Sequence, residues 1–496
     1  MKHRISRHLQ EQGPVMQRRD FLRLTAIATG SMATGSTVLP ALALPSSGQN
    51  PAGQNASGQT PAAKPPLNPA GPPHAPTPGF PSNDPRWLRT WDAAIAILSD
   101  DLHSLPRYNH PVLVEGAVYP GIWQECAPHE GLVYATLNQY ITPSSPESSP
   151  LQVARNNHMA FFSQQRPDGQ LAASIKLADP VENPGGYGQI QMVVPIAATA
   201  WELCQLPGTD AFSDELLVTA YAACSRWDQW LREYRDIRKT GLVEGFCAYD
   251  TGHDNSPRWA GIPNRCPDDD ARQSTPIPGM PRLCPDLSAT VYGARMALAH
   301  MATALGKGDE ASRWHDDAEK IRQLIIDKLY SPEDAAFYDL DTNNKFIRIR
   351  SDVISRVLAE HVLHRYDAKD KAIFEAVWTR QVHNPKAFWA PYPLTSIAQD
   401  DPTFVRPIPR NSWGGASQAL TALRAPRWMA HYGKQAELNH LMQQWCEAIS
   451  RHTEFRQQMD PLTGDFTQTD PSGYSPAALV FLDFTRPLAH TTPKTG

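Results

Sequence analysis

The sequence predicts an all-α protein in which helical hairpins close into a toroid that carries long loops at one end. Three observations predict this class. Apolar residues recur at helical spacing over most of residues 85–485, and glycine-marked turns separate neighbouring helices. In addition, two loops, 245–285 and 385–415, are unusually long and are rich in Pro, Trp and Asp. Loops of that length inside a folded domain are more typical of functional segments than of plain connections.

The clearest helical stretch covers residues 286–330. Its first half has apolar residues that step by four and three positions: Leu287, Val291, Ala294, Leu298, Met301 and Leu305. Gly306 and Gly308 end this helix, as glycine at a helix C-terminus commonly does. The same stepping then resumes from Ala311 to Leu329. Because the turn is so short, the two helices must lie antiparallel as an αα-hairpin.

Similar patterns predict further helices, at 85–104, 190–206, 212–236, 351–365, 415–432, 434–453 and 474–485. Strands are predicted to be few and short, with residues 337–339 pairing with 346–348 across a polar turn. The toroid is inferred from the number of hairpins and from chain length. A generic helical-repeat scaffold would give similar periodicity, but such scaffolds rarely carry loops this long.

The N-terminal region is predicted to lie outside the fold. Residues 1–43 contain Arg18-Arg19-Asp20-Phe21-Leu22, a mildly apolar run and a small-residue cleavage site, and they resemble a twin-arginine signal peptide. The apolar run is too interrupted for stable membrane insertion. Residues 44–83 are rich in Pro, Gly and Ala and are predicted to form a disordered linker. The folded domain is therefore expected to span 84–496, in a protein exported to the periplasm or secreted.

The composition narrows the set of partners. A formal net charge of −5 offers no basic field for nucleic acid and no polybasic patch for a membrane surface. The seven cysteines include no CxxC pair, so zinc chemistry is not expected, and no metal or cofactor is predicted. Cys266 and Cys284 bracket a Pro-rich loop and are a possible disulfide in an oxidising compartment.

The most informative segment is 249–259, which reads Tyr-Asp-Thr-Gly-His-Asp-Asn-Ser-Pro-Arg-Trp. It places Asp250 and Asp254 one helical turn apart, with Arg258 nearby as a bidentate clamp. Carboxyl groups beside Tyr and Trp are positions where a raised pKa is plausible. A capped turn, in which Ser256 precedes Pro at the start of a new helix, explains the same residues about equally well.

This segment resembles the Trp-Glu-Ser-Gly-x-Asp-Asn-Ser-Pro-Arg-Trp motif of the (α/α)6-barrel glycosidases, which include glycoside hydrolase family 63, the family 37 trehalases and mannosylglycerate hydrolases. The resemblance implies an (α/α)6 fold, hydrolysis of a glycosidic bond with inversion, and a carbohydrate substrate. The general acid of the motif falls on Asp254. Asn255, Arg258 and Trp259 match directly, His253 occupies the variable position, and Asp250 replaces the usual Glu.

Three further stretches match the family order along the chain. Residues 119–125 (Tyr-Pro-Gly-Ile-Trp-Gln-Glu) resemble the aromatic entry motif, and residues 410–416 resemble a segment that precedes a late barrel helix. Residues 459–478 contain Asp-Pro-Leu-Thr-Gly and Tyr-Ser-Pro-Ala-Ala, which resemble the closing motifs. The sugar contacts implied by the four stretches are Trp123, Glu125, Tyr249, Asp250, His253, Asn255, Arg258, Trp259, Trp413, Gln457 and Tyr474.

The general base is where the chain departs from the family. Inverting hydrolysis needs a second carboxylate to activate water. The family places a Glu three residues before the Asp of Asp-Pro-x-Thr-Gly, but this chain has Gln457 there, and an amide cannot accept the proton of water. We expect the base on the same loop, with Glu454 as first choice and Asp460 next. Alternatives elsewhere are Glu125, Asp250 and Glu244.

Two rival functions remain open at this point. Either a divergent enzyme, such as a polysaccharide lyase or sugar epimerase, or a non-catalytic periplasmic sugar-binding protein would also be compatible with Gln457. A lyase would use Tyr or His as its base and would release an unsaturated product, whereas a binding protein would never release reducing ends.

Overall fold

Helices dominate the part of the chain that the structure describes, and they fall into two sets that alternate along the sequence. The computed structural model describes residues 84–409, 411–467 and 472–491, so the predicted signal peptide and linker lie outside the described residues. The first set contains α3 (Ala127–Thr136), α5 (Ile196–Cys204), α7 (Pro285–Ala304), α9 (Val353–Ala359), α11 (Ala419–Met429) and α13 (Ser475–Thr491). The second set contains α2 (Pro85–Asp100), α4 (Pro150–Ser163), α6 (Ser213–Tyr234), α8 (Gly308–Leu324), α10 (Ala368–Val377) and α12 (Gln435–His452).

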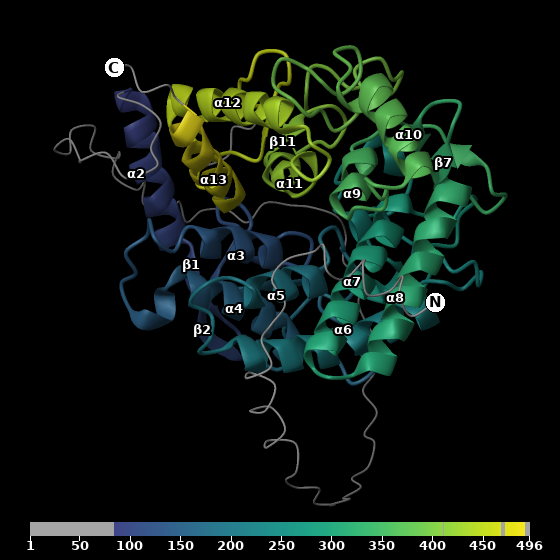
Figure 1. Ribbon diagram of the computed structural model, residues 1–496, viewed down its shortest axis with the longest axis horizontal. Coiled ribbons are helices and arrows are strands. Elements are labelled where there is room, and N and C mark those ends of the chain that lie inside the picture. The colour runs from purple at the N-terminus through teal and green to yellow at the C-terminus, as the bar shows by residue number, and fades with distance from the viewer. Residues whose placement is uncertain (1–83, 410, 468–471, 492–496) are drawn as a thin grey trace, which may run out of the picture. The chain divides into compact units, whose positions relative to one another are not determined.

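The contacts of the first set run along the chain and then return to its start. Each helix of the set contacts the next, from α3 through α5, α7, α9 and α11 to α13, and α13 contacts α3. Most helices of the second set pack on a neighbour in the first: α4 on α3, α6 on α5, α8 on α7, α12 on α11 and α2 on α13. In Figure 1 the first set accordingly lies nearer the centre, and the second set lies around it.

Local sequence explains where several of these helices begin and end. Asp84 caps α2 by accepting the backbone N–H of Arg86, and Ser149 caps α4 by accepting that of Gln152. Proline occupies the first turn of both helices, where its missing N–H costs nothing. After α7 the chain reverses at Gly306, which has a φ of 72°. The predicted hairpin of 286–330 is therefore confirmed as α7 and α8.

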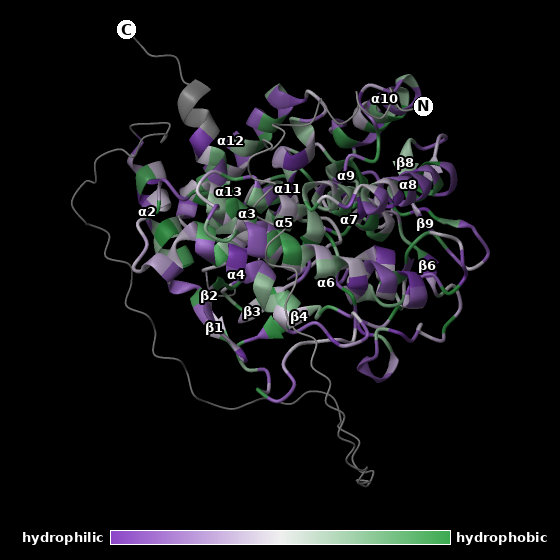
Figure 2. Ribbon diagram, turned by 60° about the horizontal axis from the view of Figure 1, so that its bottom comes forward, coloured by the Kyte–Doolittle hydropathy of each residue, from purple (hydrophilic) through white to green (hydrophobic). Residues whose placement is uncertain are grey.

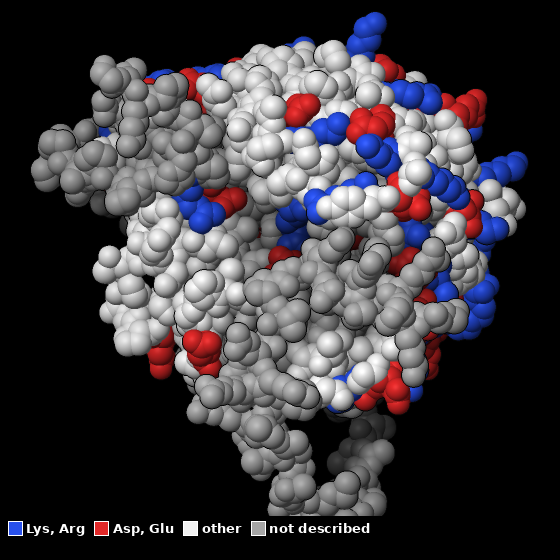
Figure 3. Space-filling view, in the orientation of Figure 1, with Lys and Arg blue, Asp and Glu red and all other residues white. Residues whose placement is uncertain are grey.

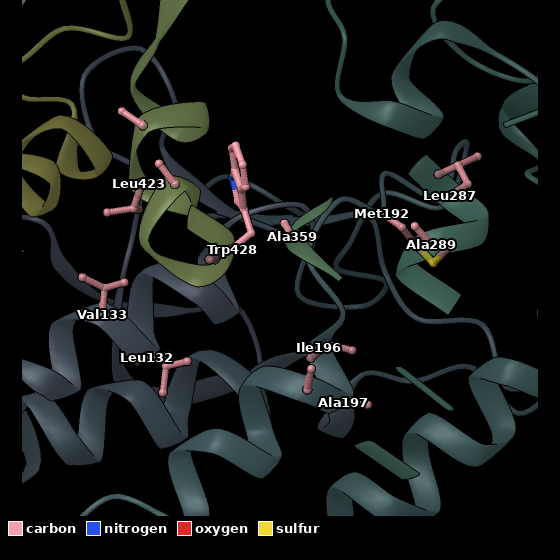
Figure 4. Close-up of a cluster of buried hydrophobic side chains, with 14 of the residues drawn as sticks. Leu132, Val133, Met192, Ile196, Ala197, Leu287, Ala289, Ala359, Leu423 and Trp428 are labelled. Atoms are coloured by element: carbon pink, nitrogen blue, oxygen red, sulfur yellow. The ribbon is translucent and has the colours of Figure 1, made fainter. Parts of the chain in front are cut away.

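Apolar side chains fill the space between the helices of the first set, whereas α8 of the second set buries little. Figure 4 shows apolar side chains that gather between α3, α5, α7, α9 and α11, among them Leu132, Ile196, Leu287 and Trp428. By contrast, the described residues of α8 that are fully buried are only Ala318 and Ile321, and Figure 2 shows this helix as largely hydrophilic. The apolar stepping seen in the sequence thus faces the first set.

Strands are present but short, and all of their pairs are antiparallel. They are β1 (Leu102–Leu105), β2 (Tyr108–Leu113), β3 (Gly121–Trp123), β4 (Ser174–Lys176), β5 (Glu244–Gly245), β6 (Arg282–Leu283), β7 (Tyr330–Ser331), β8 (Ala336–Phe337), β9 (Asp339–Leu340), β10 (Phe346–Ile347), β11 (Ser417–Gln418) and β12 (Gln458–Met459). The largest sheet has the order β10-β9-β6-β5, and the other pairs are β1-β2, β3-β4, β7-β8 and β11-β12. Phe346 pairs with Leu340 and Ile347 with Asp339, so the predicted hairpin exists with its first strand slightly later.

Several of the strands stand directly before helices of the first set. β3 leads into α3, β6 into α7 and β11 into α11. Short sheets therefore fix the loops that enter these three helices at their N-terminal ends.

The surface charge and the helix composition bear on the partners that were predicted from the sequence. Figure 3 shows Lys and Arg side by side with Asp and Glu on the face that it displays, without a large region of one sign. Within the described ranges, no helix has both the length and the low polarity needed to cross a membrane.

Candidate active site

The loop that carries Asp254, residues 246–259, is anchored by a neighbouring carboxylate. Asp250 is fully buried and accepts hydrogen bonds from the backbone N–H groups of Ile190, Phe246 and Cys247. It also forms a bidentate ion pair with the equally buried Arg235. Because every acceptor position of this carboxylate is used, Asp250 holds the loop rather than a sugar.

A second buried network holds the other end of the loop. The Arg258 guanidinium donates to Asp286 at the start of α7 and to Asp339 in β9, at distances of 2.6–2.8 Å. Its Nη1 also donates to Nδ1 of His253, 3.1 Å away. Since a guanidinium can only donate, the His253 proton lies on Nε2, which donates to Asp352 at 2.6 Å. Burial lowers the pKa of His253 to about 4, so the ring is neutral.

These contacts show where part of the predicted sugar-binding set lies. Asp250, His253 and Arg258 are buried, and the polar groups that the motif was expected to offer to a substrate are used inside the protein. Trp259 is buried as well, and its indole N–H donates to the Thr251 hydroxyl at 2.8 Å. The motif therefore shapes the loop, and it leaves Asp254 as the acidic residue of the segment that reaches solvent.

Asp254 itself is only partly buried. Burial raises its pKa to about 6, an effect that a hydrogen bond from the Asn411 side chain at 3.3 Å partly offsets. Two hydrogen bonds join the loop around Asn411 to the Asp254 loop. Trp413 donates its backbone N–H to the Asp254 carbonyl, and Asn255 donates its side-chain amide to the Asn411 carbonyl. Asp254 thus has a fixed backbone and a proton that is available near neutral pH.

Glu125 is the carboxylate brought against this loop. It lies between β3 and α3, and it is partly exposed like Asp254. Its Oε2 lies so close to Gly252 that a Cβ there would be only 1.7 Å away. Gly252 also has a φ of 62°, a conformation that suits glycine. Burial, followed by the charge of Asp254, raises the pKa of Glu125 to about 7.

Aromatic residues lie beside these two carboxyl groups. The Tyr119 ring is 5.7 Å from that of Trp123 and 5.9 Å from that of Tyr474, and its hydroxyl donates to the Gln457 side chain at 2.9 Å. Burial and the charges of Glu115, Asp254 and Glu125 raise the pKa of the Tyr119 phenol. The predicted residues Trp123, Tyr474 and Gln457 therefore lie together around Tyr119.

Two more predicted residues, Trp413 and Tyr249, lie near these aromatic residues and Asp254. Trp413 packs with Cys126 and Trp123, and its ring lies 5.0 Å from that of His253 and over the Arg356 guanidinium. Tyr249 is partly exposed, and the charge of Asp254 adds to burial in raising the pKa of its phenol.

The predicted base, Glu454, is placed differently. Its carboxylate is 38% exposed and pairs with Arg456 at 2.8 Å. Among the contacts of the described residues, none joins Glu454 to Asp254 or Glu125. Asp460 accepts from the Leu462 backbone and pairs with Arg406, so it stabilises its own turn. Neither carboxylate is brought to the Asp254 loop by these interactions.

Sequence reasoning missed several residues around the site. Arg356 and Arg424 approach from α9 and α11, and their charges act on Glu125. Glu115 and Glu130 lie buried behind it, and Cys126 contacts Glu115. These residues belong to apolar helical stretches or strand ends, where a single charged residue gives no local signal. Asn411 lies within residues 410–416, but only Trp413 of that stretch was predicted to contact a sugar.

The disulfide considered between Cys266 and Cys284 is not formed in the structure. All seven cysteines, which lie within the described residues, are free thiols. The Cys266 sulfur lies within 4.8 Å of the Cys247 sulfur, whereas Cys284 is beside Gly245 at the other side of β5.

Three groups of described residues have donor atoms close enough for a metal, and two of them are already neutralised by arginine. Asp250 with Cys247 and Cys266 pairs with Arg235, and the group of Cys284, Asp286 and Asp339 pairs with Arg258. The third consists of Glu115, Cys126 and Glu130 behind Glu125.

A cavity of about 210 Å³ between α6, α7 and α8 contains none of the carboxyl groups and aromatic residues gathered around Asp254.

Comparisons with known proteins agree with this arrangement. Residues 150–475 match the mannosylglycerate hydrolase MGH1-like glycoside hydrolase domain. A search of curated protein sequences gives no match.

Solved structures share the fold at low sequence identity. A GH63 mannosylglycerate hydrolase from Thermus thermophilus in complex with glucose is 18% identical, with a TM-score of 0.58 over 79% of this chain and 99% of that one. An uncharacterized conserved protein from the same organism is 20% identical, with a TM-score of 0.61 over 80% of this chain and all of that one. The neutral trehalase Nth1 from Saccharomyces cerevisiae is 12% identical, with a TM-score of 0.57 over 79% of this chain and 80% of that one.

The family match covers well over half of the chain and includes the Asp254 loop, the Trp413 segment and Gln457. The chain therefore belongs to the MGH1-like glycoside hydrolases and is a glycosidase.

Proposed function

We propose that the protein hydrolyses the glycosidic bond of a small glycoside or oligosaccharide with inversion of configuration, and that Asp254 is the general acid. The proposed fold is an (α/α)6 toroid. The return of the helix contacts from α13 to α3 supports it, because such contacts are those of a closed inner ring. The site would then lie at the end of the ring where the first-set helices begin.

The surroundings of the Asp254 carboxyl group carry its assignment as the general acid. Its carboxyl group is partly exposed, its backbone is held by Trp413, and burial raises its pKa to about 6. A general acid must hold its proton near the operating pH and must still reach the substrate oxygen. Asp250, the other acid of the motif, is paired with Arg235 and has no exposed surface, so it cannot reach a substrate oxygen.

The aromatic residues support a sugar as the substrate. Tyr119, Trp123 and Tyr249 are partly exposed around the two carboxyl groups, and aromatic rings pack well against the apolar faces of pyranoses. Trp413 and Tyr474 are buried behind them and fix their positions. The related Thermus protein is described as a mannosylglycerate hydrolase, so a hexose joined to a small polar alcohol is the substrate class to try first.

We also propose that the protein is exported in folded form by the twin-arginine route to the periplasm or beyond. The support is the Arg18-Arg19 segment and the linker-like composition of residues 44–83. Fractionation of cells that express the full chain, with Arg18→Lys/Arg19→Lys as the variant, tests the route. Retention of the variant, but not of the wild type, in the cytoplasm is the expected result.

The test of function is a panel of α- and β-linked 4-nitrophenyl hexosides and of hexosyl glycerates, with the first-formed anomer read by NMR. Wild type is expected to release a sugar of inverted configuration, and Asp254→Asn to lose about 10²–10⁴-fold in kcat on unactivated substrates. A product of retained configuration would overturn inversion. An unsaturated product absorbing in the ultraviolet would reveal a lyase. Binding without release of reducing ends would favour the sugar-binding alternative that Gln457 suggests.

A further inference from the structure

We propose that Glu125 is the general base of this enzyme, in the role that a glutamate at position 457 would otherwise fill. The inference rests on the proposed function, since it completes the same reaction. It begins from Gln457, whose amide oxygen accepts a hydrogen bond from Tyr119 and has no affinity for the proton of water at neutral pH.

The other carboxylates that could serve are engaged elsewhere. Glu244 is fully buried and accepts from the backbone N–H groups of Ile237 and Arg238. Asp250 is bound to Arg235. Glu454 and Asp460 pair with arginines of their own. Of the carboxylates predicted as possible bases, Glu125 is the one that is partly exposed and lies against Gly252 of the Asp254 loop.

The position of Glu125 is held by the protein. Its Oε2 fits against Gly252 and accepts a hydrogen bond from the Gln191 side chain at 3.3 Å. Gln191 is in turn oriented by Gln189, whose amide donates to it at 3.0 Å. Asp250 fixes this segment by accepting the N–H of Ile190. The motif loop and the Gln191 segment are therefore joined to each other, and together they fix the position of Glu125.

Two arginines partly offset the rise in the pKa of Glu125. Arg356 and Arg424 approach it from α9 and α11 and stabilise its ionised form, whereas Asp254 has no arginine among the groups that shift its pKa. Burial and Asp254 act in the opposite direction on Glu125.

Two more carboxyl groups lie near Glu125, and its charge contributes to the rise in their pKa values. Burial raises the pKa of Glu130 to about 8 and that of Glu115 well above its usual range. Each of them interacts with Glu125, so neither is a counter-charge for it. Because the charge of Asp254 raises the pKa of Glu125, the two carboxyl groups titrate as one coupled pair, which passes through a state with one proton and one negative charge. One proton and one negative charge are the two things that the reaction requires.

The reaction balances in atoms and charge. Glu125 takes a proton from water, and the water oxygen bonds to the anomeric carbon on the face opposite the leaving group. The glycosidic C–O bond breaks, its electron pair passes to the leaving oxygen, and Asp254 protonates that oxygen. The products are the free sugar and the alcohol, and the proton returns from Glu125 to Asp254 through solvent.

The experiment compares the two carboxyl groups on one 4-nitrophenyl hexoside that the wild type hydrolyses and on the matching glyceryl hexoside. Nitrophenolate leaves without protonation, so Asp254→Asn should retain activity on the first substrate and lose it on the second. Glu125→Gln should lose at least about 10²-fold in kcat on both, because water needs a base in either case.

Azide supplies the discriminating readout. It is already anionic and needs no base, so it should restore Glu125→Ala and yield a glycosyl azide of inverted configuration. Azide should give no such product with Asp254→Asn. Glu360→Gln is the matched control, since burial raises the pKa of Glu360 as it does that of Glu125, but Glu360 lies at the far end of α9 from Asp352. The thermal midpoint of every variant is measured to show that it folds.

The outcomes separate the two proposals. If Glu125→Gln keeps near wild-type kcat, or if Glu454→Gln shows the azide-restored loss instead, the base is not Glu125, although the glycosidase remains. If the wild type itself releases no sugar from any member of the panel, the proposed function fails and the base assignment fails with it.

Discussion

The raised pKa of Asp254 has a thermodynamic cost that can be measured apart from catalysis. The pKa rises from 3.8 to about 6, a difference of roughly 2 units, and each unit is worth about 1.4 kcal/mol. The full linkage would be about 3 kcal/mol, and partial exposure of the carboxyl to solvent reduces it to about 1–2 kcal/mol. Asp254→Asn removes the charge and keeps the shape, so it should stabilise the protein by that amount at pH 8.

The size of this stabilisation by Asp254→Asn depends on pH. A carboxyl whose pKa is raised by folding is not penalised below its unfolded value, and the penalty grows as the pH rises from about 4 to about 6. The advantage of Asp254→Asn should therefore be largest above pH 6 and should shrink toward zero near pH 4.

Guanidinium titrations of wild type and Asp254→Asn at pH 4, 6 and 8 measure this difference in the free energy of unfolding. Asp316→Asn serves as the control, because the Asp316 side chain is 73% exposed. An Asp254→Asn protein that is less stable than wild type at pH 8, or a difference that does not change with pH, would refute the reasoning about burial.

Three more outcomes are expected. The kcat/KM of the wild type should show a narrow bell-shaped pH profile with its maximum between about pH 6 and 7, and its acidic limb should disappear when the base is replaced by an amide; a profile flat from pH 5 to 8 would count against the coupled pair. Gly252→Ala should lower kcat/KM by about tenfold or more, since its Cβ collides with the Glu125 carboxylate and its φ is positive, whereas Gly433→Ala, also at positive φ but with open space, should leave kcat/KM unchanged. If the purified protein is exposed to a disulfide donor, non-reducing peptide maps should link Cys247 to Cys266 and not Cys266 to Cys284, and the reverse pairing would contradict the structure.

The fold could be predicted where large apolar residues recur at helical spacing. α7 and α8 are such helices, and their bounds match the stepping of Leu287 and its successors. α3 was missed because nearly all of its residues are buried, including Glu130, so no period appears. α4 was missed because buried asparagines, Asn156 and Asn157, interrupt its apolar face while they bond to neighbouring backbone.

The site could be predicted only in part, for a related reason. Asp254 belongs to a motif whose members are neighbours in the chain, so it could be found from the sequence. Most of that motif, however, binds to itself and to Arg235, Asp286 and Asp352, and these contacts come from residues far along the chain. The position of Glu125 against Gly252 depends on the same long-range contacts. The order of residues along the chain cannot show which carboxylate meets Asp254.

The contact of α13 with α3 has a consequence for the chain as it is made. α13 begins at Ser475, whose N–H bonds to the Glu115 carbonyl, and Tyr474 lies against Tyr119. The last of the described helices thus packs behind the segment that carries Glu125. A product that stops before residue 475 would leave the apolar flanks of α3 and α11 uncovered, and it would be inert rather than partly active.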